Sequence, residues 1–264
     1  MNAQAEYVEM DSGLVIPRSV GEDMKLAGCR PKAVDLFCGC GGFSLGIMQA
    51  GFEVVAAVDN NVDAAITYTM NLGRHPMTFV FVDDSDRRAL EKALTKKYRH
   101  ADRHQRDLLV EQATTGSGWI STHPKTPGVG HFFLGDICKI KGRDILAAVE
   151  LEVGELDAVI GSPPCQGFSR ANIHNGPDDP RNALMWEFAR LIVEMQPKTL
   201  CMENVPEITT MTTPEGLLVL DVFCRILEDG NFACVDALRH AMKHQVGITL
   251  MRSRKPEKKR GKKR

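Results

Sequence analysis

Short apolar runs that end at glycines or acids alternate with helical patterns along most of this chain. The first run is KAVDLF at 32–37, and glycines follow it, as they follow many buried parallel strands. We expect strands at 32–37, 52–58, 131–134, 156–160, 199–202 and 232–237, and helices at 43–50, 63–71, 143–151, 182–195 and 217–227. This strand–helix order predicts an α/β fold with a doubly wound parallel sheet and right-handed crossovers.

The alternation breaks at residues 83–130, which are rich in charges and then in Gly, Ser, Thr and Pro. Leu90, Leu94 and Tyr98 fit one helical face, so we expect a solvent-exposed helical insertion followed by a loop. A DNA-contacting helix is the alternative, but the mixed charges favour a solvated face. The expected organisation is a lead-in at 1–31, a main domain at 32–251 that contains the insertion, and a basic tail at 252–264.

Charge and composition exclude several classes of protein. With 43% hydrophobic residues the chain is too apolar to be disordered, and it has no apolar run of ~20 residues that would predict a membrane span. The eight cysteines include no Cys-x-x-Cys pair, so we expect no zinc site and reduced thiols in the cytoplasm. The whole chain carries −1 and residues 252–264 carry +8, so residues 1–251 carry −9.

Polar and glycine residues gather where predicted strands end, which is where ligands bind in open α/β sheets. The loop FCGCGG at 37–42 follows the first strand, although a tight turn would serve packing equally well. Asp59 ends the second strand, about 20 residues later, where an acid accepts hydrogen bonds from ribose hydroxyls; alternatively it caps the next helix. Asp136 ends a third strand and is placed to bind an adenine amino group. Because no phosphate-binding glycine motif occurs, these residues favour S-adenosylmethionine as cofactor.

A candidate nucleophile follows the strand at 156–160. Two prolines stiffen the turn SPPCQGFS, and Cys165 emerges from it at the functional edge of the sheet. A buried structural cysteine is the alternative. Glu203 ends the neighbouring predicted strand. A thiolate that attacks C6 of cytosine needs a group that holds or protonates N3, so this pair suits methylation at C5 of a base flipped out of the duplex.

These segments resemble the DNA cytosine-5 methyltransferase family. DLFCGCGG at 35–42 is similar to its first motif, PPCQGFS at 163–169 to its catalytic signature, and ENV at 203–205 to the partner of that signature. The resemblance implies a Rossmann-like methyltransferase sheet, with Cys165, Glu203, Arg252 and Arg254 as catalytic residues. The implied cofactor-binding residues are Phe37, Gly39, Gly41, Gly42, Asp59, Asn60, Asp136, Ile137, Pro164 and Leu184. The arginines lie in GITLMRSR at 247–254, where Thr249 and Leu250 replace the Pro and Gln of the family.

After Arg254 the sequence shows no counterpart of the family's target-recognition domain. The resemblance implies DNA as the substrate, in a restriction–modification, phage or plasmid setting. Because no recognition domain is visible, we expect a second polypeptide to carry target recognition. The alternatives are a non-catalytic remnant that binds S-adenosylmethionine or DNA, and an NAD-dependent oxidoreductase on the same sheet. The oxidoreductase would give no role to Pro163, Pro164 and Cys165.

Overall fold

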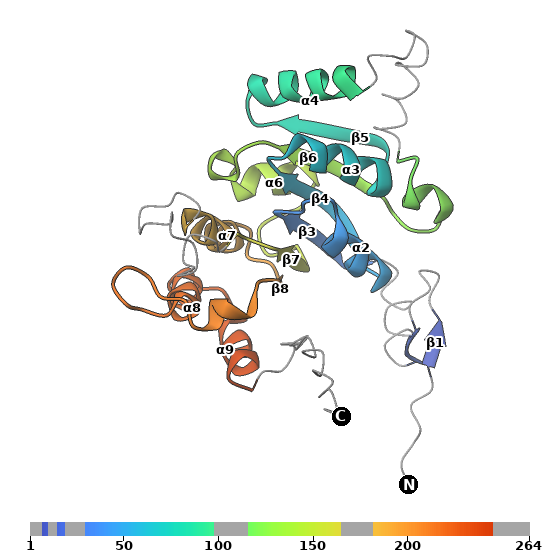
Figure 1. The fold of residues 1–264 in the computed structure, drawn as a ribbon. Coiled ribbons are helices and arrows are strands. Elements are labelled where there is room, and N and C mark those ends of the chain that lie inside the picture. The colour runs from blue at the N-terminus through green and yellow to red at the C-terminus, as the bar shows by residue number, and fades with distance from the viewer. Residues whose placement is uncertain (1–6, 10–14, 19–29, 98–115, 165–181, 245–264) are drawn as a thin grey trace, which may run out of the picture.

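A six-stranded parallel sheet forms the centre of the molecule (Figure 1). The computed structural model describes residues 7–9, 15–18, 30–97, 116–164 and 182–244. The strands of the sheet are β3 (Lys32–Leu36), β4 (Glu53–Asp59), β5 (Gly73–Phe81), β6 (Val129–Leu134), β7 (Ala158–Gly161) and β8 (Thr199–Met202). Their order is β5-β6-β4-β3-β7-β8, and every neighbouring pair is parallel. The chain passes from β6 to the far side of β3, so the order reverses beside β3.

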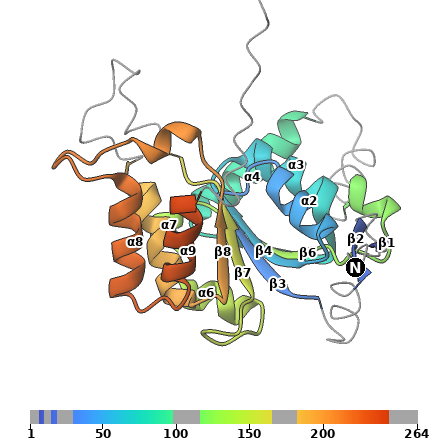
Figure 2. The ribbon, with the colours of Figure 1, turned by 90° about the horizontal axis from the view of Figure 1, so that it is seen from below.

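Helices cover both faces of this sheet (Figure 2). One face carries α2 (Gly42–Gln49), α3 (Val62–Leu72) and α4 (Asp84–Lys97), and the other carries α6 (Gly142–Ala148), α7 (Asn182–Met195), α8 (Val219–Asp229) and α9 (Val235–His244). Each face buries its own apolar cluster, with Met48, Ile66 and Tyr68 on the first side and Phe188, Ile192 and Phe223 on the second. The central strands are therefore buried on both sides, which confirms the predicted doubly wound, Rossmann-like α/β fold.

Among the described residues, short 3-10 helices lie in the connections at η1 (Trp119–Thr122), η2 (Ile137–Lys139) and η4 (Pro206–Thr209). Two short strands, β1 (Tyr7–Glu9) and β2 (Val15–Pro17), pair antiparallel in the segment that we treated as an unpatterned lead-in. Within the described residues no helix is long and apolar enough to span a membrane, and no cluster of side chains suits a metal ion.

The last expected strand, at 232–237, is wrong. Residues Val235–His244 form α9, because Val235, Leu238 and Met242 recur at helical spacing and pack on the same apolar cluster as α8. The Cys224 thiol of α8 lies 3.7 Å from the Met242 sulfur, which ties the two helices together.

Strand β5 was not predicted from the sequence. Its sequence contains Pro76, which lacks an N–H and so interrupts a strand pattern. The structure accommodates this residue at the sheet edge, where the register against β6 shifts between Gly73 and Thr78. In the segment expected to be an insertion, α4 buries Leu90 and Leu94, while Arg87, Arg88, Glu91 and Lys92 are exposed.

Candidate functional site

The glycine loop after β3 makes a left-handed turn into α2. Phe37, Gly39 and Gly41 all have positive φ, at 59°, 51° and 92°. A Cβ on Gly41 would lie 2.6 Å from a Leu72 methyl and 2.9 Å from the Tyr68 ring, so packing against α3 requires this glycine. A Cβ on Gly39 would meet nothing within 4 Å. The two glycines therefore have different roles: Gly41 permits close packing against α3, whereas the space next to Gly39 is open.

The Asp59 carboxylate joins this loop to the end of β4. Oδ2 accepts a hydrogen bond from the Gly39 N–H at 2.8 Å, and Oδ1 accepts one from the Asn61 N–H at 2.8 Å. The N-cap of α3 is Asn61, whose side chain accepts from the Ala64 N–H at 3.0 Å, so Asp59 is not the helix cap. Asn60 between them is exposed.

The end of β6 lies directly beside Asp59. The Gly135 N–H donates to the Asp59 carbonyl at 3.1 Å, and Asp136 follows as an exposed residue. The Asp136 carboxylate caps η2 by accepting from the Cys138 N–H at 3.0 Å, and Ile137 is buried beneath the turn. The predicted ribose and adenine acids are therefore neighbours at one edge of the sheet.

Strands β7 and β8 bring the proline turn and Glu203 together. The Ser162 N–H donates to the Leu36 carbonyl at 3.3 Å, which places the turn next to β3. The Asn204 side-chain amide donates to the Pro163 carbonyl at 2.9 Å, and the Glu203 N–H donates to the Gly161 carbonyl at 3.0 Å. Glu203 itself is exposed and Pro164 is partly buried. Cys165, Arg252 and Arg254 lie outside the described residues.

Helix α7 supports the turn from one face of the sheet. Leu184 in its first turn is partly buried and packs on the core, and the Phe188 ring lies 6.4 Å from the Phe37 ring. A Cβ on Gly161 would approach Phe188 to 2.6 Å and the Leu36 carbonyl oxygen to 2.5 Å. Close packing among β3, β7 and α7 therefore brings Phe37 next to Phe188, which follows Leu184 by one helical turn on α7.

A buried polar group beneath the glycine loop was not singled out from the sequence. Asp35 is fully buried, its Oδ2 accepts from the Ser44 hydroxyl at 2.6 Å, and Ser44 Oγ lies 2.7 Å from the Tyr68 hydroxyl. Burial raises the pKa of Asp35 to about 7, the Ser44 hydrogen bonds oppose this shift, and the charge of Asp59 adds to it. The sequence signal that could have identified Asp35 is the presence of an acid inside the apolar run KAVDLF.

The thiol of Cys138 is held neutral beside Asp136. Burial, hydrogen bonding to Asp136 and the charges of Asp136 and Glu187 raise the pKa of Cys138 to about 11. An uncharged thiol is a poor nucleophile, so Cys138 in this state is poorly suited to nucleophilic attack.

Comparison with known proteins places these features in a family context. The sequence model of the C-5 cytosine-specific DNA methylase family matches residues 31–98 and 128–246. The type II methyltransferase M.HgiGI of Herpetosiphon aurantiacus is 31% identical over 175 residues, which are 66% of this chain and 90% of that protein.

Two further relatives are longer than this chain. M.AquIA, a type II methyltransferase of Picosynechococcus, is 30% identical over 66% of this chain and 48% of its own length. M.MjaORF1200P of Methanocaldococcus jannaschii is 30% identical over 67% of this chain and 49% of its own length. The chain therefore spans about half the length of these two relatives.

Proposed function

Since this chain belongs to the C-5 cytosine-specific DNA methylase family, we propose that it transfers a methyl group from S-adenosylmethionine to C5 of cytosine in DNA. One observation carries the proposal: the hydrogen bond from Asn204 to the Pro163 carbonyl. This contact holds the exposed Glu203 beside the turn that leads into Cys165, next to the glycine loop of β3. A nucleophile, an acid and a cofactor site can therefore serve one substrate.

The ends of β3, β4 and β6 fit an adenosine-bearing cofactor. The open space over Gly39 and Gly42 and the two neighbouring acids support this assignment. We assign Asp59 to the ribose hydroxyls and Asp136 to the adenine amino group. The remaining cofactor contacts that we propose come from Phe37, Gly39, Gly41, Gly42, Asn60, Ile137, Pro164 and Leu184.

The proposed reaction begins when the Cys165 thiolate forms a bond to C6 of a cytosine flipped out of the duplex. The electron pair of the C5–C6 double bond moves toward N3, where Glu203 holds or protonates the ring nitrogen. Bound S-adenosylmethionine would supply the methyl group to C5, with cleavage of its S–methyl bond and S-adenosylhomocysteine as the leaving group. Loss of the C5 proton to a base and departure of the thiolate then restore the ring. We propose that Arg252 and Arg254 contact the flipped base and a neighbouring phosphate.

We propose a catalytic domain at 32–251 that contains the insertion at 83–130, followed by a basic tail at 252–264. We also propose that the protein acts in a restriction–modification, phage or plasmid system and is located in the cytoplasm. A second polypeptide that supplies target recognition is the partner that we propose, because base readout needs side chains held in a groove.

Covalent trapping tests the nucleophile. DNA that contains 5-fluorocytosine cannot lose its C5 substituent as a proton, so the Cys165 adduct should persist and migrate as a protein–DNA band. Cys165→Ser should abolish this band and keep cofactor binding. The matched control Cys201→Ser changes an exposed thiol on β8 and should trap as well as the wild type. Trapping by Cys165→Ser at the wild-type rate would exclude Cys165 from the mechanism.

A further inference from the structure

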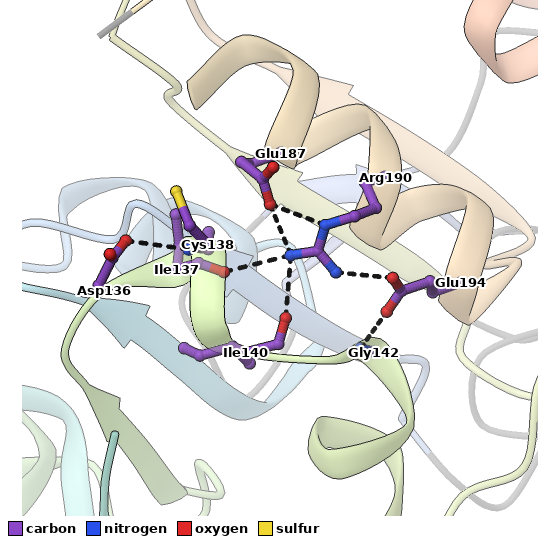
Figure 3. A network of polar contacts seen from close by, with 8 residues as sticks. All are labelled: Asp136, Ile137, Cys138, Ile140, Gly142, Glu187, Arg190 and Glu194. Atoms are coloured by element: carbon purple, nitrogen blue, oxygen red, sulfur yellow. Dashed lines mark hydrogen bonds and ion pairs between the residues drawn. The ribbon is translucent and has the colours of Figure 1, made fainter. Parts of the chain in front are cut away.

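One arginine side chain of α7 holds the turn that begins at Asp136 (Figure 3). Arg190 Nη2 donates to the Ile137 carbonyl at 3.2 Å and to the Ile140 carbonyl at 2.9 Å. These two carbonyls lie within η2 and directly after it, and they are separated from Arg190 by about fifty residues of sequence. The guanidinium therefore fixes this turn from a different element of the fold.

Two glutamates on the same helix orient the guanidinium. Arg190 Nε donates to Glu187 at 2.7 Å, and Nη1 donates to Glu194 at 2.6 Å. Glu194 also accepts from the Gly142 N–H at 2.6 Å, so the same network holds the first residue of α6. All three side chains are about a quarter to a third exposed, at 31% for Arg190, 23% for Glu187 and 34% for Glu194. Bonds in this half-buried setting are less screened than those of a surface ion pair.

The network uses the full donor geometry of arginine. Nε, Nη1 and Nη2 each have acceptors, and the planar guanidinium presents them in fixed directions. Burial alone would lower the pKa of Arg190, but the hydrogen bonds and charges of Glu194 and Glu187 outweigh it and raise the pKa, so the group stays charged. A lysine has a single nitrogen on a flexible stem and cannot make these contacts together.

The turn that Arg190 holds carries the acid assigned to adenine. The Asp136 carboxylate accepts a hydrogen bond from the Cys138 N–H inside the turn, so the position of the carboxylate depends on the conformation of η2. We propose that Arg190 is a positioning residue for adenine selectivity: it fixes η2 so that Asp136 can accept a hydrogen bond from the adenine amino group of the cofactor. This inference rests on the proposed function.

The experiment compares S-adenosylhomocysteine with its inosine analogue, which differ at the purine 6-position. The adenine form carries an amino donor there, whereas the inosine form carries a carbonyl oxygen, which a carboxylate does not bind, and has a hydrogen on N1. Calorimetry with the wild-type chain should show about a tenfold or greater preference for the adenine form, the effect of one lost hydrogen bond. Arg190→Lys should lose most of this preference, because Asp136 is no longer held in position.

Controls separate positioning from general weakening. Arg225→Lys changes an exposed arginine on α8 and should keep the wild-type preference. Glu187→Gln keeps the helix intact and should lower the preference partly, so it serves if Arg190→Lys does not fold. If both variants of the network bind the two compounds more weakly by equal factors, or keep the wild-type preference, the positioning role is wrong. If the wild type itself shows no preference, the assignment of adenine to Asp136 fails, and the inference fails with it.

Discussion

The loops that end β3, β4 and β6 are held differently from those that end β7 and β8. In the first group, both oxygens of Asp59 accept backbone N–H groups, and Asp136 accepts another. In the second group, Glu203 is fixed through its backbone N–H, and among the described residues no hydrogen bond engages its carboxylate. The neighbouring Asn204 supplies the side-chain contact.

The two ways of holding a carboxylate suit two different functions. A carboxylate bonded to backbone N–H groups holds its loop in place before a ligand arrives, and its oxygens retain lone pairs for further donors. An exposed carboxylate without such bonds keeps its full capacity for a reacting group. Under the proposed function, the first group binds a cofactor whose adenosine part stays unchanged, and the second group faces a substrate whose charge changes during the reaction.

The largest effect that separates the two regions is expected at Glu203. Glu203→Gln should lower turnover by about 10²–10⁴-fold, the usual contribution of a general acid–base group, and leave cofactor affinity unchanged. Methyl transfer to DNA and calorimetry measure the two quantities. Glu207→Gln, an exposed neighbour on η4, is the control and should keep turnover. A matching loss of cofactor affinity in Glu203→Gln would show that the two regions are not separate.

The next effect concerns Asp35, the buried acid beneath the glycine loop. Its pKa is about 7 in the folded state and 3.8 when unfolded, so between pH 4 and pH 7 the folded state binds more protons. Its contribution to stability therefore falls as pH rises through this window, by roughly 4 kcal/mol at ~1.4 kcal/mol per tenfold change in the equilibrium. Asp35→Asn keeps an acceptor for the Ser44 hydroxyl, and its stability should not show this decrease as pH rises.

Thermal unfolding of both proteins from pH 4 to pH 8 measures the difference. The wild type should lose stability relative to Asp35→Asn as pH rises, while Asp144→Asn, on the exposed side of α6, should follow the wild type. Parallel profiles for wild type and Asp35→Asn would mean that Asp35 is ionised in the folded protein.

The smallest of the three effects is expected at Asp59. Asp59→Ala removes the acceptors for ribose and for the Gly39 N–H, and each buried unpaired group costs roughly 1–3 kcal/mol. Affinity for S-adenosylmethionine should fall by about tenfold or more, with no effect on trapping by Cys165 once cofactor is saturating. Asp63→Ala removes an equal charge from the first turn of α3 and is the control. Unchanged affinity in Asp59→Ala would contradict the ribose assignment.

Sequence patterns predicted the central part of the fold well. The helix Asn182–Met195 and the strand Thr199–Met202 have the bounds that the sequence indicated. The bounds of β3, β4, β6 and β7 differ from the expected ones by one or two residues, whereas β5 was not predicted. Buried parallel strands are continuous apolar runs, and this signal is local. The glycine loop and both acids were recognisable because the residue types themselves limit what a strand end can do.

The remaining features depend on which segments meet in space. β6 lies between β4 and β5, although β5 comes before it in the chain, and no local pattern encodes that order. Residues of α9 were mistaken for a strand because 232–235 are apolar; the helical spacing of Val235, Leu238 and Met242 is decisive once these residues pack with α8. By itself, the sequence determined the strand ends and the chemistry placed on them. The tertiary structure decided the contact of Asn204 with Pro163 and that of Arg190 with Ile140, because a hydrogen bond across 41 or 50 residues exists only once the strand order has brought its partners together.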